Sequence, residues 1–192
     1  LAAIGFYRLP DFVMGVMANP FYLDLGFTKS EIASVSKLFG IWMTIAGTLI
    51  GGLVAPRIGM MRMLLIGAVL VSITNLAYAW LATIGPDIRA LTVTVSLENL
   101  AGGFGGTALI AYMSSLTSRA FTATQYALFS SFFALPGKLA GGFSGVMVDS
   151  LGGFYGFFIL TAAMGVPAVL LVLLLMRISR PAAGAKSAAA AV

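Results

Sequence analysis

Six apolar segments follow one another along the chain, and short polar connections separate them. A helix that crosses a lipid bilayer needs about 20 consecutive, mostly apolar residues, and each of these segments reaches about that length. We place them near residues 1–23, 32–55, 63–82, 90–116, 124–148 and 154–176. This pattern predicts an all-α integral membrane protein with six transmembrane helices.

The composition supports a membrane protein and argues against several other classes. Hydrophobic residues make up 60% of the chain and charged residues only 9%, whereas soluble domains carry about 25% charged residues. The 192 residues include no Cys and no His, which removes disulfides, imidazole metal sites and catalytic triads built on these residues. We therefore expect no metal, no cofactor and no enzymatic activity. Because a net charge of +5 is typical of basic loops beside a membrane, we expect no nucleic-acid partner.

The basic residues are distributed unevenly between the two sides of the predicted bundle. Six helices bring both ends of the segment to one side. The opposite side holds only Lys29 and Arg89 in its connections. Since cytoplasmic loops carry the excess of Lys and Arg, we expect both ends to be cytoplasmic. The six basic residues on that side are Arg57, Arg62, Arg119, Arg177, Arg180 and Lys186.

The two ends of the chain lead to two further expectations. The sequence begins at Leu1, without Met and already inside an apolar segment, so we expect an N-terminal part to precede it. The Ala-rich residues 181–192 have no hydrophobic periodicity and are predicted to form a flexible cytoplasmic tail.

Two glycine motifs lie 93 residues apart and indicate an internal repeat. GLVAPRIG at 52–59 and GVMVDSLG at 145–152 both read Gly, three residues, a turn-forming residue, two residues and Gly. They lie on opposite sides of the predicted membrane. Residues 1–85 and 86–178 are therefore predicted to be two copies in opposite orientation. Such an inverted 3+3 repeat resembles one half of a major-facilitator transporter, which would comprise residues 1–180.

Arg8 and Asp11 are charged residues within the first apolar segment. They lie three residues apart, on one helix face, and Pro10 and Pro20 are expected to interrupt the segment. Charges inside a bilayer are costly unless they are paired or face a wet cavity, so this stretch is typical of a transport pathway. Two interpretations stay open. The charges neutralise each other, or Arg8 binds an anionic substrate group while Asp11 holds Arg8 or titrates.

Further polar residues lie deep in the later segments. Glu98 lies about nine residues into the fourth segment, which is roughly 13 Å at 1.5 Å per residue. It is a candidate proton carrier or, alternatively, a structural hydrogen-bonding group between helices. Lys138 is a candidate second anion contact. Asn99, Tyr7 and Asn19 are further candidate substrate contacts.

Three polar side chains in the second and third segments receive structural interpretations. Lys37 lies about one and a half turns into its segment, so it is interpreted as reaching the membrane interface along its aliphatic stem. Asn75 and Tyr78 are interpreted as packing residues.

The loop between the second and third segments resembles the cytoplasmic motif of the major-facilitator family, G-x-x-x-D-R-x-G-x-R/K-R/K. Pro56 replaces the acidic residue of that motif, and Met61 replaces one basic residue. This loop therefore lacks the acidic partner of a charge lock, whereas the inverted copy carries an acid at the matching place. The predicted conformational motif comprises Gly52, Arg57, Gly59, Arg62 and, in the inverted copy, Asp149.

The opening run carries a more specific resemblance. YRLPDFVMGVMANPFY at 7–22, followed by DLGFTK at 24–29 and EIA at 31–33, resembles the start of the C-terminal half of AmpG-type muropeptide permeases. That resemblance implies proton-driven import of anionic N-acetylglucosaminyl-anhydromuramyl peptides through the bacterial inner membrane for cell-wall recycling. It also implies a missing N-terminal half with six further spans and part of the site. A related branch carries acetyl-coenzyme A, so the fold alone does not define the substrate.

Three classes of function remain to be separated. The first is a proton-coupled carrier. The second, an intramembrane enzyme, would need a catalytic His, a metal cluster or an acidic loop motif, and the sequence has none of these. The third is a non-transporting scaffold, for which charges buried in the membrane would be a needless cost. Neutralising these charges should abolish uptake by a carrier while its membrane abundance stays normal.

Overall fold

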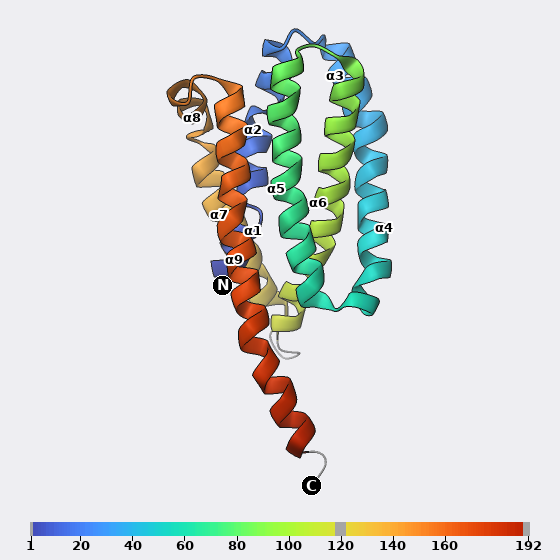
Figure 1. Cartoon of the computed structure of the whole chain (residues 1–192), viewed down its shortest axis with the longest axis vertical. Helices are drawn as coiled ribbons and strands as arrows, with labels where there is room; N and C mark the ends of the chain where they lie inside the picture. Colours follow the sequence, from blue (N-terminus) through green and yellow to red (C-terminus); the bar gives the residue numbers. More distant parts are fainter. Residues whose placement is uncertain (1, 118–121, 190–192) are drawn as a thin grey trace.

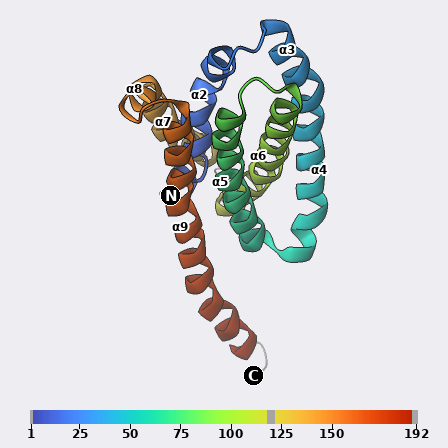
Figure 2. The same cartoon turned by 45° about the horizontal axis from the view of Figure 1, so that its top comes forward.

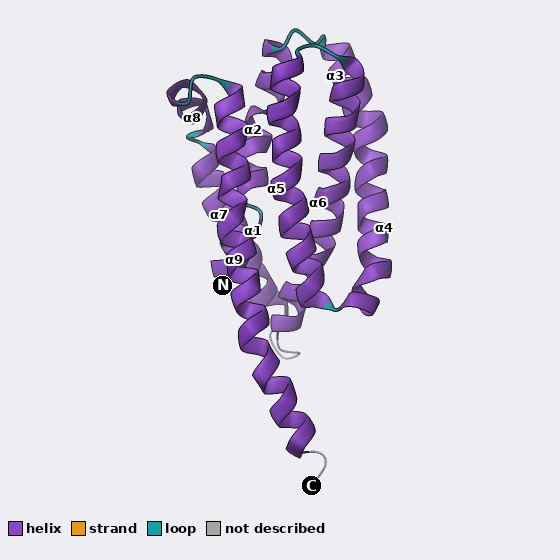
Figure 3. Cartoon of the chain, viewed as in Figure 1, coloured by secondary structure: helices purple, strands orange, loops and turns teal. Residues whose placement is uncertain are grey.

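The computed structural model describes residues 2–117 and 122–189, which form helices joined by short connections (Figure 1). No strand occurs within these ranges (Figure 3), so the prediction of an all-α protein is confirmed. The helices lie side by side in one elongated bundle. They are α1 (Ala2–Tyr7), α2 (Leu9–Asp24), α3 (Lys29–Ser34), the π-helix η1 (Val35–Gly40), α4 (Ile41–Ile58), α5 (Met60–Ile84), α6 (Ile88–Leu116), α7 (Thr122–Gly141), α8 (Ser144–Ser150) and α9 (Phe154–Ala189).

Three helical stretches of the described residues are long and apolar enough to cross a membrane. They are Lys29–Ile58, Met60–Ile84 and Phe154–Ile178. The other three predicted segments are also helical, but the first is divided into α1 and α2 and the fifth into α7 and α8. The crossing of a membrane by six segments therefore stays a prediction.

The first segment is broken at Arg8, whose φ of −112° and ψ of 10° are not helical. Pro10 stands in the first turn of α2, where a missing N–H group costs nothing. Pro20 lies inside α2 without ending it. The prediction that both prolines interrupt this segment is therefore wrong in detail, because the break precedes Pro10 and the helix continues through Pro20.

The second segment is a continuous helical rod made of α3, η1 and α4. It begins with a capping box, in which the Thr28 N–H group donates to Glu31 Oε2 at 2.9 Å and the Glu31 N–H group donates to Thr28 Oγ1 at 3.3 Å. The π-helical turn at 35–40 was not predicted. Such turns are rare and often occur at functional sites.

The packing of the bundle pairs particular helices. α5 packs most extensively against α9 and α6, α4 packs against α6, and α1 and α2 pack against α7 (Figures 1 and 2). Glycines allow the closest approaches, because a Cβ at Gly47 would collide with the Leu100 carbonyl and one at Gly67 would lie 2.9 Å from the Gly105 Cα. Small residues at helix contacts serve the same purpose in membrane bundles generally.

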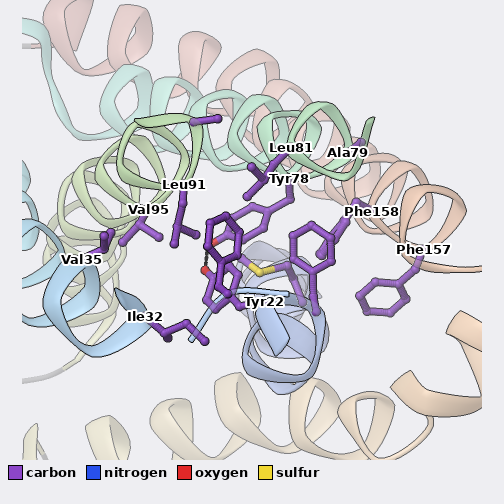
Figure 4. Packing of buried hydrophobic residues seen from close by; sticks show 14 of the residues in the cluster. Tyr22, Ile32, Val35, Tyr78, Ala79, Leu81, Leu91, Val95, Phe157 and Phe158 are labelled. Carbon is purple, nitrogen blue, oxygen red and sulfur yellow. Dashed lines mark hydrogen bonds between the residues drawn. The ribbon is translucent and has the colours of Figure 1, made fainter. Parts of the chain in front are cut away.

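The buried side chains form two clusters. One surrounds Phe21, Tyr22, Tyr78 and Phe158 between α2, α5 and α9 (Figure 4). The other surrounds Tyr7 between α1, α5 and α6 and includes Met63, Leu64, Phe104 and Ala108. The outer surfaces of the helices remain strongly apolar, with Trp42, Leu49, Leu53 and Leu170 among the exposed side chains.

α1 begins, and α9 ends, towards the end of the bundle where α4 turns into α5 (Figure 1). α9 continues as a helix to Ala189, so the backbone of the predicted tail is helical over most of its length, while its flexibility stays a prediction. Of the basic residues used to predict the orientation, Arg119 lies outside the described residues, as do the side chains of Arg180 and Lys186.

Candidate functional site

The break between α1 and α2 holds the predicted charged pair. Arg8 Nε lies 2.9 Å from Asp11 Oδ2, and the two side chains are 29% and 14% exposed. Arg8 Nη1 also lies 3.5 Å from the carbonyl oxygen of Gly102 in α6. The guanidinium rests over Gly106 as well, where a Cβ would lie 3.4 Å from Arg8 Nη1. The pair therefore neutralises itself and ties the broken helix to α6, while part of its surface stays accessible.

Tyr7, next to this break, is a core residue. Its side chain is 2% exposed and its hydroxyl donates to the Leu64 carbonyl at 3.1 Å. The same hydroxyl lies against Gly67 and Gly105 at the contact of α5 and α6. In this conformation the Tyr7 hydroxyl faces the core, and its role as a substrate contact stays a prediction.

Glu98 ends a chain of hydroxyl groups that begins on α2. Tyr22 and Tyr78 have their hydroxyl oxygens 2.8 Å apart (Figure 4), and the Tyr78 hydroxyl donates to Glu98 Oε2 at 2.8 Å. A tyrosine hydroxyl carries one proton. Since Tyr78 uses its proton towards an ionised Glu98, the Tyr22 hydroxyl must donate to Tyr78. A protonated Glu98 could instead donate to Tyr78, which would reverse the direction of both hydrogen bonds.

Asn99 extends the chain from Glu98 to the π-helix. Its Nδ2 donates to the Val95 carbonyl at 2.8 Å and lies 3.3 Å from Glu98 Oε2. Its Oδ1 lies 3.0 Å from the Thr44 hydroxyl, which also lies 2.9 Å from the Gly40 carbonyl at the end of η1. The polar groups thus link α2, α5, α6, α4 and η1 across an otherwise apolar bundle. Asn99 is a link in this network as well as a candidate substrate contact.

The acids and the arginine form one electrostatic group. Glu98 interacts with both Asp11 and Arg8 through space, in addition to its hydrogen bonds. Glu98, Gly102 and Gly106 are spaced four residues apart, so they share one face of α6, and Arg8 lies over that face. Two acids and one fixed cation can hold one mobile proton, which is the minimum that proton coupling requires.

Two grooves hold the predicted cationic and amide contacts. A groove of about 350 Å³ between α2 and α3–η1 is lined by Asn19, Lys29, Ser36 and Lys37. Among the described residues, no carboxylate lies within ion-pair distance of either lysine. Lys138 lines a separate groove of about 380 Å³ on α7. Asn19 and Lys138 are exposed, but they belong to different grooves and neither lies at the Arg8–Asp11 pair.

The predicted loop motif lies at the turn from α4 to α5. Arg57 and Arg62 are exposed there, and Gly59 adopts a φ of 81°, which only Gly adopts readily. Arg57 Nη1 lies 3.5 Å from the carbonyl of Leu53 in its own helix, and neither arginine pairs with a carboxylate of the described residues. Asp149 lies at the end of α8, in a pocket of about 560 Å³ that Asp24 also lines.

Sequence reasoning missed Tyr22 and Thr44 and assigned Tyr78 to packing alone. Tyr78 is indeed fully buried in an aromatic cluster, but it is also the direct partner of Glu98. Their spacing in sequence carries no signal, because 56 residues separate Tyr22 from Tyr78 and 55 separate Thr44 from Asn99. Lys37, interpreted as an interface lysine, lies in the groove that contains Asn19.

An all-helical membrane bundle with an ion pair at a helix break and a partly buried carboxyl has the features of a membrane carrier. The sequence profile of the Major Facilitator Superfamily matches residues 1–191, and the chain therefore belongs to this superfamily.

Within the superfamily, the chain is similar to proteins named as AmpG transporters. The chain is 37% identical over 175 residues to the protein named "Putative transporter AmpG 4" of Rickettsia conorii. This alignment covers 91% of this chain and 42% of that protein. It is 38% identical over 147 residues to "Putative transporter AmpG 3" of Rickettsia prowazekii, and this alignment covers 77% of this chain and 33% of the relative. It is 36% identical over 167 residues to "Putative transporter AmpG 1" of the same species, and this alignment covers 87% of this chain and 38% of the relative. The chain thus spans between one third and about two fifths of the length of these relatives.

Proposed function

We propose that this chain is the C-terminal half of a proton-coupled secondary transporter that imports anhydromuropeptides across the bacterial inner membrane for cell-wall recycling. The observation that carries the proposal is the Glu98 carboxylate, held by Tyr78 within the bundle and interacting with Asp11 and Arg8. Ionisable groups at such depth are costly and are typical of proton relays. The similarity to proteins named as AmpG transporters supports the substrate class.

Two features support an inverted repeat within this half. Gly59 and Gly152 are 93 residues apart, and both follow a helix with a left-handed φ, of 81° and 74°. The helix contacts are also symmetric, because α2 packs on α7 as α6 packs on α4, while α5 packs on α9. If the first, second and third segments trade places with the fourth, fifth and sixth, the same pairs of segments remain in contact. The substrate cavity would then lie against the N-terminal half, with both ends of this half in the cytoplasm.

The proposed roles follow from charge and position. Asp11 and Glu98 share the coupled proton, and Arg8 holds either one acid or an anionic group of the substrate. Asn19, Asn99 and Lys138 supply further substrate contacts from three different helices. Tyr7, which is buried in this conformation, would reach the substrate only after a change in the packing of α1. The loop with Arg57 and Arg62 would act in the conformational change without an internal acidic partner.

Two alternatives differ in what they require of the same residues. A carrier of another anion, such as acetyl-coenzyme A, would use the same cations and the same acids. A non-transporting scaffold would need none of these charges. The network around Glu98 favours a carrier, because an apolar residue would pack there at lower cost than a carboxylate with four polar neighbours.

The test is uptake of labelled N-acetylglucosaminyl-anhydromuramyl peptide by cells that lack their own permease and express the full-length gene. We expect uptake that a protonophore abolishes, and loss of uptake in Glu98→Gln at normal membrane abundance. Glu31→Gln is the matched control, since its carboxylate is exposed and only caps α3. Absence of uptake by wild-type protein that reaches the membrane would refute the muropeptide assignment. Uptake that survives both Glu98→Gln and the protonophore would refute proton coupling through Glu98.

A further inference from the structure

Two fully buried polar side chains, one on α5 and one on α6, carry atoms without hydrogen-bond partners. Asn75 in α5 and Thr94 in α6 are both 0% exposed. Neither Nδ2 nor Oδ1 of Asn75, nor Oγ1 of Thr94, finds a partner among the described residues. Nearly all buried polar groups in folded proteins are hydrogen-bonded to protein or to ordered water, so these three atoms require an explanation.

The register of the two helices places these residues beside the Tyr78–Glu98 hydrogen bond. α5 and α6 are antiparallel neighbours whose backbones meet at Gly67 and Gly105. Asn75 and Tyr78 are one turn apart on α5, and Thr94 and Glu98 are one turn apart on α6. Because Tyr78 donates to Glu98 across the contact, Asn75 and Thr94 flank that bond on its two sides along the helix axes.

The unpaired atoms match the hydrogen-bonding capacity of water. A buried water molecule forms about three hydrogen bonds, with both donors and acceptors. Because Asn75 and Thr94 lie on opposite sides of the Tyr78–Glu98 bond, each would bind a water of its own. Asn75 Nδ2 can donate and its Oδ1 can accept, and the Thr94 hydroxyl can do either. A bound metal cation would be held by the oxygens alone and would leave the Nδ2 group unpaired. The donor and acceptor set therefore favours water over a cation.

We propose that Asn75 and Thr94 bind ordered water next to Glu98 and that the coupled proton reaches the carboxylate through this water. The proposal rests on the proposed function insofar as it assigns the water a role in coupling. The bound water gives one proton to a Glu98 carboxylate oxygen and accepts one proton from a further water molecule on the aqueous side, so it is unchanged. Asn75 and Thr94 act as positioning residues that hold the water and take no proton themselves.

The chain offers a matched set of variants. Thr94→Val and Asn75→Leu remove unpaired polar atoms while keeping similar volume. Thr74→Val is the control, because Thr74 is buried on α5 one residue before Asn75, but its hydroxyl already donates to the Val71 carbonyl at 2.9 Å. Replacement of an unpaired buried polar group by an apolar one of the same shape is close to neutral for stability. We therefore expect normal membrane abundance from all three variants.

The first measurement separates proton-driven uptake from exchange of labelled for unlabelled muropeptide across the membrane, which needs no net proton movement. We expect Asn75→Leu and Thr94→Val to lower proton-driven uptake by roughly tenfold or more, since a positioned proton-transfer group contributes at least that much, with exchange nearly unchanged. Thr74→Val should alter neither. Equal loss of uptake and exchange, or normal uptake in both variants, would overturn the role in coupling. A requirement for sodium in wild-type uptake would instead identify a cation site.

The second measurement does not depend on the substrate. Radiolytic labelling by hydroxyl radicals marks side chains that touch bound water. Tyr78 is 0% exposed, so its labelling in the full-length protein would report internal water, and this labelling should disappear in Asn75→Leu. Tyr7 is the control, because its buried hydroxyl is already bonded to Leu64 and should stay unlabelled. An unlabelled Tyr78 in wild-type protein would overturn the water site itself, whatever the transported solute proves to be.

Discussion

Replacement of Tyr78 by Phe tests whether the hydroxyl chain stabilises the bundle. The Tyr78 hydroxyl makes two hydrogen bonds, one from Tyr22 and one to Glu98, both of 2.8 Å. Its ring is fully buried and lies 5.2 Å from the Phe158 ring, and a Phe ring fits the same space. The substitution therefore removes two hydrogen bonds and leaves the packing in place.

The expected magnitude follows from the two bonds. Hydrogen bonds between membrane helices contribute about 0.6 kcal/mol on average and about 1.7 kcal/mol at most. The bond to the carboxylate belongs to the upper part of this range, because charge-assisted hydrogen bonds are about twice as strong as neutral ones. We expect Tyr78→Phe to lower the free energy of unfolding by about 2 kcal/mol, since it also leaves the Tyr22 hydroxyl buried without a partner. Tyr22→Phe should cost about 0.6 kcal/mol, because Tyr78 can still donate to Glu98.

The assay is denaturant unfolding of the purified full-length protein in mixed micelles, followed by tryptophan fluorescence. Tyr112→Phe is the control, since Tyr112 is 8% exposed and its hydroxyl bonds none of the described residues. The double variant Tyr22→Phe/Tyr78→Phe should be no less stable than Tyr78→Phe alone. An equal loss of unfolding free energy in Tyr78→Phe and Tyr112→Phe would refute the reasoning that Tyr22 donates to Tyr78 and Tyr78 to Glu98. A larger loss in Tyr22→Phe than in Tyr78→Phe would refute it as well.

Three further outcomes are expected. Arg8→Gln and Asp11→Asn should each lower the free energy of unfolding more than the double variant does, because one partner alone leaves an uncompensated charge, and denaturant unfolding of the purified full-length protein in mixed micelles measures this. Gly47→Ala should destabilise by about 1–3 kcal/mol, because its Cβ meets a carbonyl of α6, whereas Gly15→Ala enters open space and should change the unfolding free energy by about 0.5 kcal/mol or less. Two backbone N–H groups of α6 donate to the Asp87 carboxylate and lower its pKa. The stabilisation by Asp87 is therefore complete above the unfolded pKa of about 3.9, and it is lost as the pH falls through the lower pKa of the folded protein. Asp87→Asn should flatten the acid side of a plot of unfolding temperature against pH.

The sequence was sufficient to predict the all-helical class and the approximate positions of the apolar segments, because long apolar runs have a direct physical meaning in a bilayer. It was also sufficient for the Arg8–Asp11 contact, since residues three apart on a helix are neighbours. The sequence predicts interruptions at Pro10 and Pro20, whereas the structure has one break, at Arg8, between α1 and α2. Pro10 is compatible with the first turn of a helix, so the helix breaks two residues before it, at Arg8.

The partners of Glu98 could not be predicted from the sequence. Whether Tyr78 reaches Glu98 depends on the register of α5 against α6, and close glycine contacts set that register. A change of one turn would separate the two groups by about 5 Å and would leave no trace in composition or hydropathy. The π-helical turn at 35–40 depends on packing in the same way, since its last residue lies against Asn99.

The polar chain crosses between the two proposed repeats, and this position determines what it can do. Tyr22, Tyr78 and Thr44 belong to the first repeat, whereas Glu98 and Asn99 belong to the second. Any sliding of one repeat against the other must break these hydrogen bonds, and a buried unpaired group opposes such a change. Protonation of Glu98 replaces a charge-assisted bond from Tyr78 by a weaker neutral one, so it lowers the cost of sliding. The gain or loss of one proton at this carboxyl can therefore bias the movement of the repeats, without a separate element to transmit the signal.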